Sequence, residues 1–355
     1  MEFYRKIALV GGGTAGHITP NIALIPELKK RNYDIIYIGS KNGMEKDIIP
    51  KYNIPFFGIT TDKLRRYFDI KNLFIPINLI KGINEAYSIL KKEKIDIIFS
   101  KGGYVAVPVI IAAKMLKIPV ISHEADLTPG LANKIATPHS KIICCNFEET
   151  AKMFGKKGFH TGSPIRQDIL NGNREKGQKL LSFKTNKPII LVTGGSLGSR
   201  YINNLIRSNL TKLLKEYNIV HQCGNGNIDS SISYDGYKQY EIISENLADI
   251  FAASDFVISR SGANIIFELL SLKKPNLLIP LSKKASRGDQ ILNANVFEKK
   301  GYSIVLTEEE ATKYPNHFFE KLQQLYIHRE EYIDAMKKSK EIDAINIICD
   351  LIDKT

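Results

Sequence analysis

Residues 7–17 read IALVGGGTAGH, and this stretch decides the fold class. Residues 7–10 form a short apolar run of the kind that builds a buried strand. The glycines after it permit a tight turn and a close backbone approach to a ligand, and Pro20 marks the first turn of a helix. A strand, a glycine loop and a helix in this order predict one βα unit of a parallel sheet.

The same alternation continues along the chain, with helical stretches such as 21–31 and 108–116 between the apolar runs. We expect buried parallel strands at residues 7–10, 35–38, 95–100, 120–123, 142–145, 189–192, 219–222, 240–243, 256–259 and 276–279. Strands that alternate with helices predict an α/β fold, with parallel sheets covered by helices on both faces.

The chain has 355 residues, and single hydrophobic cores stop growing at about 250–300 residues. The βα pattern restarts near residue 189, after a polar stretch. We therefore predict two Rossmann-like domains, at residues 1–163 and 164–335. We expect the remaining residues, 336–355, to form a helix that packs back on the first domain.

The composition limits the class of protein. A hydrophobic content of 43% and a charged content of 25% are typical of a soluble globular chain. We expect no signal peptide and no membrane span, since no apolar run approaches the roughly 20 residues that a span needs. The net charge of +13 suits phosphate-rich partners, or reflects only a lysine-rich composition. The four cysteines lack metal-ligand spacing, which favours reduced thiols.

The first glycine loop formally matches the G-x-G-x-x-G pattern of dinucleotide sites. Such a site needs an acid about 20 residues on, at the end of the second strand, to bind the ribose. Here the second expected strand ends in Gly39 and Ser40, and the next acid is Glu45. This argues against a nicotinamide enzyme. His17 directly follows the last glycine, where an acid–base or hydrogen-bonding role is favoured.

A second glycine loop, residues 193–200, reads TGGSLGSR and opens the second half in the same strand–loop–helix context. Its backbone N–H groups and the Ser196 hydroxyl are suited to a diphosphate, and the alternative is a plain tight turn. Ligands of parallel α/β sheets bind beyond the carboxyl ends of the strands. We therefore expect the following residues along one edge of the first sheet: His17, Tyr104, His123, Glu124 and Asp126. For His123 and Glu124, a purely structural network is the alternative.

In their order along the chain these segments resemble the MurG family, which adds N-acetylglucosamine to lipid I in peptidoglycan synthesis. The resemblance spans roughly residues 7–300 and rests on segments 11–17, 101–104, 123–124, 128–134, 162–166, 194–198, 260–263 with Glu268, 289–290 and 293–294. It implies a glycosyltransferase of the GT-B type, whose two Rossmann-like domains face each other across a cleft.

The resemblance further implies an inverting transfer of N-acetylglucosamine from UDP-N-acetylglucosamine to the C4 hydroxyl of undecaprenyl-diphosphate-MurNAc-pentapeptide, which is lipid I. The product of this reaction is lipid II. UDP-N-acetylglucosamine is then a substrate, and no cofactor, bound metal or nucleic acid is expected. The expected location is peripheral, on the cytoplasmic side of the cell membrane. Lipid I, the anionic membrane surface and cell-wall synthesis proteins are the expected partners.

By the family's pattern, most donor contacts lie in the second half. The resemblance assigns the diphosphate to Arg166 and Ser196, the ribose to Glu268, the uracil to the backbone at Ser244, the sugar to Asp289 and Gln290, and further contacts to Ala263, Asp126, Thr14, Ala15 and Gly16. The family often has Asn at position 126 and Gln at position 289, so the roles of Asp126 and Asp289 stay open.

His17 is the leading candidate for the general base that deprotonates the acceptor hydroxyl, with Glu124 or His123 as the next candidates. The chain has no Asp-x-Asp pair of the kind that carries Mg²⁺ in metal-dependent sugar transferases. We therefore expect a helix N-terminus, Ser196 and Arg166 to neutralise the diphosphate.

Residues 63–81 contain five basic residues against one acid, interleaved with apolar side chains. This pattern predicts binding to an anionic membrane surface, and an ordinary amphipathic helix that covers the sheet is the alternative. We assign acceptor or membrane contacts to Tyr104, Arg65, Arg66, Phe74 and Ile75. Two other functions remain open: a UDP-N-acetylglucosamine epimerase of the same architecture, and a non-catalytic nucleotide-binding module.

Overall fold

The computed structural model describes residues 5–62, 75–195, 197–283, 286–339 and 343–355. It divides into two compact units, which we call unit 1 (Met1–Arg166 with Ile342–Thr355) and unit 2 (Gln167–Glu341). The chain thus leaves unit 1 after Arg166, where we expected a boundary after residue 163, and returns to it near residue 342. In the described ranges, no helix is long and apolar enough to cross a membrane.

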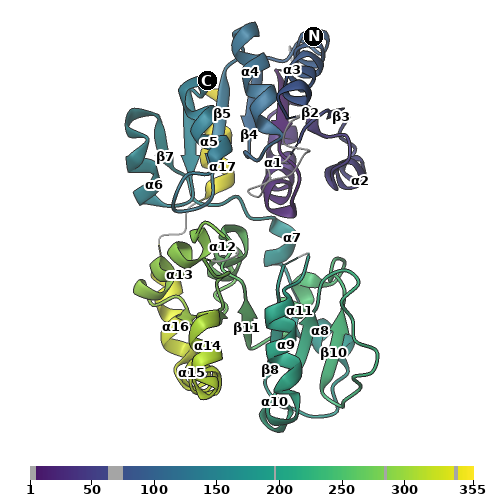
Figure 1. Ribbon diagram of the computed structural model, residues 1–355, viewed down its shortest axis with the longest axis vertical. Coiled ribbons are helices and arrows are strands. Elements are labelled where there is room, and N and C mark those ends of the chain that lie inside the picture. Colours follow the sequence, from purple (N-terminus) through teal and green to yellow (C-terminus); the bar gives the residue numbers. More distant parts are fainter. Residues whose placement is uncertain (1–4, 63–74, 196, 284–285, 340–342) are drawn as a thin grey trace. The chain divides into compact units, whose positions relative to one another are not determined.

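Unit 1 contains a seven-stranded sheet in which every pair of neighbours is parallel (Figure 1). The strand order is β3-β2-β1-β4-β5-β6-β7. The strands are β1 (Lys6–Val10), β2 (Asp34–Ser40), β3 (Phe56–Ile59), β4 (Ile97–Ser100), β5 (Val120–Glu124), β6 (Ile142–Cys145) and β7 (Gly158–His160). The helices are α1 (Thr19–Lys30), α2 (Glu45–Ile48), α3 (Ile75–Lys92), α4 (Ala106–Leu116), α5 (Leu131–Ala136), α6 (Glu148–Met153) and α17 (Ala344–Asp353).

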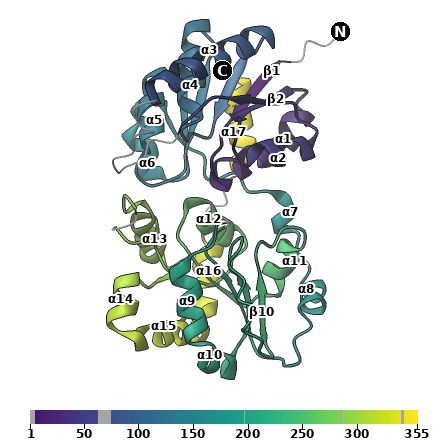
Figure 2. The ribbon, with the colours of Figure 1, turned by 45° about the vertical axis from the view of Figure 1, so that its right-hand side comes forward.

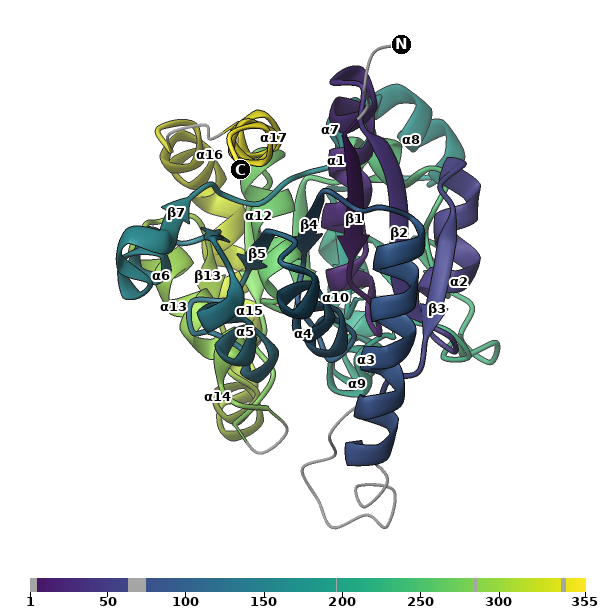
Figure 3. The ribbon, with the colours of Figure 1, turned by 90° about the horizontal axis from the view of Figure 1, so that it is seen from above.

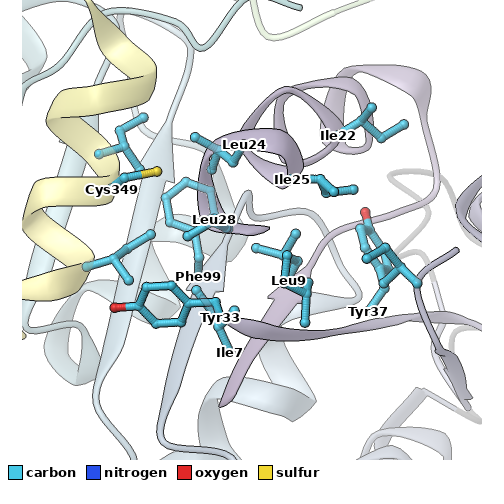
Figure 4. Close-up of a cluster of buried hydrophobic side chains, with 14 of the residues drawn as sticks. Ile7, Leu9, Ile22, Leu24, Ile25, Leu28, Tyr33, Tyr37, Phe99 and Cys349 are labelled. Carbon is cyan, nitrogen blue, oxygen red and sulfur yellow. The ribbon is translucent and has the colours of Figure 1, made fainter. Parts of the chain in front are cut away.

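Alternate side chains of β1 enter different cores, because successive residues of a strand point to opposite faces. Ile7 and Leu9 pack with α1 and with Cys349 of α17 in one cluster (Figure 4). Ala8 and Val10 pack with α3 and α4 in the other cluster. Helices therefore cover both faces of the sheet, and its strands are buried on each side, as parallel sheets require.

The C-terminal helix α17 belongs to unit 1 although it follows the whole of unit 2 in the sequence (Figure 2). Arg31 at the end of α1 forms ion pairs of 2.6 Å with both Asp350 and Asp353. The Tyr33 hydroxyl donates to Asp353 at 2.7 Å. These contacts and the buried side chains of α17 hold the C-terminus on the core of unit 1.

Unit 2 contains a six-stranded parallel sheet with the order β10-β9-β8-β11-β12-β13. The strands are β8 (Ile189–Thr193), β9 (Asn218–Gln222), β10 (Tyr237–Tyr240), β11 (Phe256–Ser259), β12 (Asn276–Leu278) and β13 (Ile304–Val305). The helices are α7 (Gln167–Leu170), α8 (Arg174–Leu181), α9 (Arg200–Ser208), α10 (Leu210–Glu216), α11 (Leu247–Ala253), α12 (Ala263–Ser271), α13 (Asp289–Lys299), α14 (Glu308–Lys313), α15 (Pro315–Ile327) and α16 (Arg329–Lys337). Side chains of α9, α10 and α15 pack on one face of this sheet.

The predicted fold class, two parallel-sheet α/β units, is confirmed. The expected strand at residues 240–243 is wrong, since β10 is Tyr237–Tyr240. β10 is an edge strand whose last three residues are only partly buried. Its sequence, YKQY, therefore lacks the apolar run that predicts a strand. β3, β7 and β13, which were not expected, are also edge strands.

Candidate active site

The first glycine loop connects β1 to α1 and places His17 at the end of a short 3-10 turn, Ala15–His17. Gly13 has a φ of +82°, in the left-handed region that favours glycine. The Thr14 hydroxyl lies 2.9 Å from His17 Nδ1, within hydrogen-bonding distance. When Nε2 accepts a proton, Nδ1 carries the other ring hydrogen and donates it to Thr14 Oγ1. The pair is therefore suited to act as a base oriented by a hydroxyl.

The loop after β4 packs directly on this first loop. A Cβ on Gly13 would lie 2.4 Å from Cε1 of Tyr104, and a Cβ on Gly103 would lie 3.4 Å from Nδ1 of His17. Both positions have positive φ, which favours glycine, and at Gly13 the ring of Tyr104 also leaves no room for a Cβ. Burial, and then the charge of Glu45, raise the pKa of the half-buried Tyr104. The structure thus brings together His17 and Tyr104, which were expected along one edge of the sheet, and places Thr14 beside His17.

His123 and Glu124 end β5 and are buried. Glu124 accepts hydrogen bonds from the backbone N–H groups of Asp126 and Gly130, at 3.0 and 2.9 Å, and from the Asn133 amide at 2.8 Å. Burial raises the pKa of Glu124. Burial, and then the charge of Lys101, hold the pKa of His123 well below its usual range. These contacts favour the structural alternative, in which the two residues shape the loop after β5, over a role as base.

Lys101 is a buried lysine that was not among the predicted site residues. It directly follows β4, and its backbone N–H donates to Val10 at 2.9 Å, which joins the ends of β4 and β1. Burial lowers the pKa of Lys101 to about 8, against the charges of Glu124 and Asp126, which act in the opposite direction. The signal in the sequence is a lysine directly between a buried strand and two glycines.

In unit 2, the second glycine loop connects β8 to α9. Gly198 has a φ of +73°, and a Cβ there would lie 1.9 Å from the carbonyl oxygen of Cys223 at the end of β9. Only glycine permits this approach of two backbones. Ser199 caps α9 by accepting a hydrogen bond from Ile202 N at 3.3 Å. The loop therefore presents the N-terminus of α9 at the carboxyl end of the sheet, a favourable place for an anion.

Gln222 links the second glycine loop to the segment that carries Ser244. Its amide nitrogen donates to Thr193 Oγ1 at 3.1 Å and to Gly195 O at 3.3 Å. Its Oε1 accepts from Ile243 N at 3.0 Å. Since Ser244 is the next residue, the predicted diphosphate and uracil segments are neighbours in the structure.

Arg260, which follows β11, joins several loops of the same sheet edge. Its guanidinium donates to Ser199 Oγ at 2.7 Å and to the carbonyls of Ile279 and Pro280, each at 3.1 Å. It also forms an ion pair of 2.6 Å with Glu308 at the start of α14. Arg260 thus connects the β8–α9 loop to the loop after β12 and to α14.

Helix α12 begins at Ala263, and Glu268 lies in its second turn. The dipole of a helix acts mainly within its first turn, so it does not by itself explain an acid at position 268. Gln290 at the start of α13 accepts a hydrogen bond from Leu281 N at 3.0 Å through Oε1, and from Ser261 Oγ at 2.9 Å through its backbone carbonyl. The starts of α12 and α13 are therefore joined.

The predicted donor residues are divided between the two units. One of them, Asp289 at the start of α13, forms an ion pair in which its Oδ1 lies 3.6 Å from Nε of Arg287. Unit 1 contains Thr14, Ala15, Gly16, Asp126 and Arg166, and unit 2 contains Ser244, Ala263, Glu268, Asp289 and Gln290. Ser196, Arg65, Arg66, Phe74 and the side chain of Ile75 lie outside the described residues.

The four cysteines are free and buried, and burial raises the pKa of each thiol. No cluster of three or more His, Cys, Asp or Glu side chains suited to a metal ion occurs in the described part of the chain.

Comparison with known proteins identifies both units. The glycosyltransferase family 28 N-terminal domain matches residues 7–143, and the corresponding C-terminal domain matches residues 189–350. A protein of Clostridium tetani named UDP-N-acetylglucosamine–N-acetylmuramyl-(pentapeptide) pyrophosphoryl-undecaprenol N-acetylglucosamine transferase is 57% identical over 352 residues. That match covers 99% of this chain and 98% of the relative.

Among solved structures, the crystal structure of Acinetobacter baumannii MurG matches 99% of this chain and 100% of its own, with a TM-score of 0.74 and 25% identity. A UDP-GlcNAc 2-epimerase from Neisseria meningitidis, bound to UDP-GlcNAc, matches 99% of this chain and 100% of its own, with a TM-score of 0.68 and 16% identity. At that identity the second likeness shows the fold alone.

Proposed function

The chain belongs to the MurG family of glycosyltransferase family 28, and from this premise we propose that it transfers N-acetylglucosamine from UDP-N-acetylglucosamine to lipid I. The resemblance seen in the sequence is confirmed at the level of the family. The observation in the structure that carries the proposal is the pairing of His17 with Thr14 beside Tyr104. This group is suited to removing a proton from a sugar hydroxyl.

The reaction is a single displacement with inversion. The acceptor C4 hydroxyl attacks the anomeric carbon of the donor, its proton passes to His17 Nε2, and the bond to UDP breaks with its electron pair on the diphosphate. The Thr14 hydroxyl holds His17 through Nδ1, at 2.9 Å, and so presents Nε2 to the acceptor. His17 is preferred to Glu124, because Glu124 is buried and already accepts hydrogen bonds from two backbone N–H groups and an amide.

The donor nucleotide binds at the carboxyl edge of the unit 2 sheet. The N-terminus of α9, presented by the glycine loop, and the guanidinium of Arg166 stabilise the diphosphate as charge develops on it. The carboxylate of Glu268 on α12 accepts hydrogen bonds from the ribose hydroxyls, and the backbone near Ser244 contacts the uracil. Asp289 and Gln290 contact the sugar, and Ala263 lies at the start of the helix that carries Glu268.

A membrane surface supplies the lipid-linked acceptor. Ile77 and Ile80 of α3 are 63% and 61% exposed, and they lie three residues apart on one face of the helix. Lys81, which follows Ile80, is also exposed, and α3 lies beside α4 (Figure 3). Exposed apolar side chains beside lysines suit an anionic lipid surface. The protein then works as a peripheral protein on the cytoplasmic side of the cell membrane, where cell-wall synthesis proteins are further partners.

Co-sedimentation with vesicles that contain anionic lipid tests the membrane contact. We expect the Ile77→Asp, Ile80→Asp variant to lose most of its binding, because it places two charges on the apolar face. Ile327→Asp is the matched control, since Ile327 is 60% exposed on α15 of unit 2. Equal binding by both variants would reject the membrane role of α3.

The function is tested by incubating the protein with UDP-N-acetylglucosamine labelled in the sugar and a short-chain lipid I analogue. We expect the label to appear in a β-1,4-linked disaccharide together with one UDP per transfer. Donor incubated alone distinguishes the epimerase alternative, since an epimerase consumes or isomerises the donor without an acceptor. Donor that stays unchanged in the presence of the acceptor would support the nucleotide-binding module instead.

A further inference from the structure

Glu45, the acid that does not fit a ribose site, lies completely buried under the first glycine loop. Its Oε1 accepts a hydrogen bond from the Ser40 backbone N–H at 2.7 Å, and its Oε2 accepts one from the Gly13 N–H at 3.2 Å. No ion pair to Glu45 occurs in the described residues. In the described part of the chain, the hydrogen bonds to this buried carboxylate come from backbone N–H groups, in the way that a glycine loop stabilises a bound anion.

The glycines around Glu45 leave room for nothing larger. A Cβ on Gly12 would lie 2.1 Å from Oε1, one on Gly43 would lie 2.3 Å from Oε1, and one on Gly39 would lie 2.5 Å from Cγ. A side chain at the middle glycine of the Gly11–Gly13 run would thus displace a carboxylate of the chain itself. A nucleotide phosphate is not needed to explain it.

The first glycine loop connects Glu45 to the candidate base, His17. Glu45 binds the N–H of Gly13, Gly13 supports the ring of Tyr104, and the next residue, Thr14, binds His17 Nδ1. The charge of Glu45 also contributes to the raised pKa of Tyr104. A change in the Gly13 peptide therefore moves the hydroxyl that orients the imidazole.

We propose that Glu45 is a positioning residue of the transfer reaction. Its carboxylate occupies the anion site at the base of the first glycine loop and fixes the peptide that orients His17 and Tyr104. The inference rests on the proposed function for its catalytic consequence, while the structural link from Glu45 to the loop stands independently of the substrate.

The decisive variant is Glu45→Gln in the full-length protein. The amide keeps one hydrogen-bond acceptor but places an NH₂ donor against a backbone N–H, so one of the two contacts is lost. We expect kcat for transfer to the lipid I analogue to fall about 10- to 100-fold, the loss typical of a misplaced catalytic group. The KM for UDP-N-acetylglucosamine should stay within about twofold of wild type, because most of the predicted donor contacts lie in unit 2.

Asp96→Asn is the control, at an exposed carboxylate where Glu45 is buried. The Asp96 carboxylate also accepts a backbone hydrogen bond in unit 1, from Lys6 N at 2.7 Å, but at the amino ends of the strands. We expect wild-type kcat from this variant. Equal losses from both variants would show a general effect of weakening unit 1 and would overturn the positioning role.

A double-mutant cycle with His17→Ala tests whether Glu45 acts through the base. If it does, Glu45→Gln lowers kcat by less than about threefold in the His17→Ala background. An undiminished loss in that background, or no loss in the wild-type background, would overturn the proposal.

Amide hydrogen exchange of the segment 10–18 gives a readout without substrate. We expect faster exchange in Glu45→Gln and also in Glu45→Asp. The aspartate keeps the charge but withdraws the carboxylate from the loop by one methylene. It replaces Glu45→Gln as the test variant if Glu45→Gln folds poorly. Unchanged exchange in both would refute the link to the loop. If the wild-type protein fails to transfer the sugar while exchange responds as expected, the proposed function alone is wrong.

Discussion

Replacing Arg260 with lysine tests whether the donor edge of unit 2 is held together by one guanidinium. Arg260 makes three hydrogen bonds to Ser199 and to two carbonyls, and an ion pair with Glu308, while its side chain and that of Glu308 are only 12% and 17% exposed. A lysine keeps the charge, but its single ammonium lacks the forked geometry that reaches all of these acceptors.

The loss can be estimated from these contacts. Two or three hydrogen bonds, at about 1 kcal/mol each, give a destabilisation of about 2–3 kcal/mol. For a unit of this size the midpoint of thermal unfolding should fall by on the order of 5–10 °C. Because Ser199 caps α9, the loop that meets the diphosphate also loses support, and we expect the Kd for UDP to rise about tenfold.

Differential scanning calorimetry and titration calorimetry with UDP measure the two effects. Arg174→Lys is the matched control, since the Arg174–Asp255 pair has a similar distance of 2.8 Å but its arginine is 49% exposed. An exposed pair should contribute less than about 1 kcal/mol. If Arg260→Lys unfolds and binds UDP like the control, the loops are held by other contacts and the reasoning is refuted.

Two further predictions concern histidines. His17→Ala should lower the single-turnover rate of glycosyl transfer by about 10²–10⁴-fold, the usual contribution of a general base; a loss below tenfold, measured by rapid quench, would exclude His17 from that role. His221 is buried between Asn203 and Tyr237, and burial lowers its pKa from 6.5 to about 3. The unfolded chain therefore binds a proton below about pH 6.5 that the folded unit does not bind until about pH 3. The free energy of unfolding should fall as the pH is lowered through this window, and His221→Gln should show a smaller fall between pH 7.5 and 5 in urea titrations. The exposed His328→Gln is the control, and an identical pH dependence in both variants would contradict the assignment.

The structure also changes the meaning of the first glycine loop. As a sequence pattern it suggests a ligand cradle, whereas in the fold one of its N–H groups is bound by Glu45 and its tip presents the Thr14–His17 pair. The glycines of the second loop serve close backbone packing, and its anion-binding interpretation rests on the N-terminus of α9, which the loop presents.

The sequence by itself determined the fold class, the central strands and the positions of both glycine loops. This was possible because these features depend on local patterns: apolar runs of strand length, glycines at strand ends and helical stretches between them. The residues near His17 were also predictable, because the carboxyl ends of parallel strands gather at one edge.

Only the tertiary structure decided the edge strands, the partners of the buried acids and the contacts that hold the C-terminal helix. β3, β7 and β10 are partly exposed at the edges of their sheets, and β13 is a buried edge strand of only two residues, so all four leave a weak local signal. The contacts from Glu45 to Gly13 and from Arg31 to Asp350 join residues far apart in the sequence. Whether a carboxylate is a base, a loop support or a tether depends on which distant groups surround it, and folding alone brings those groups together.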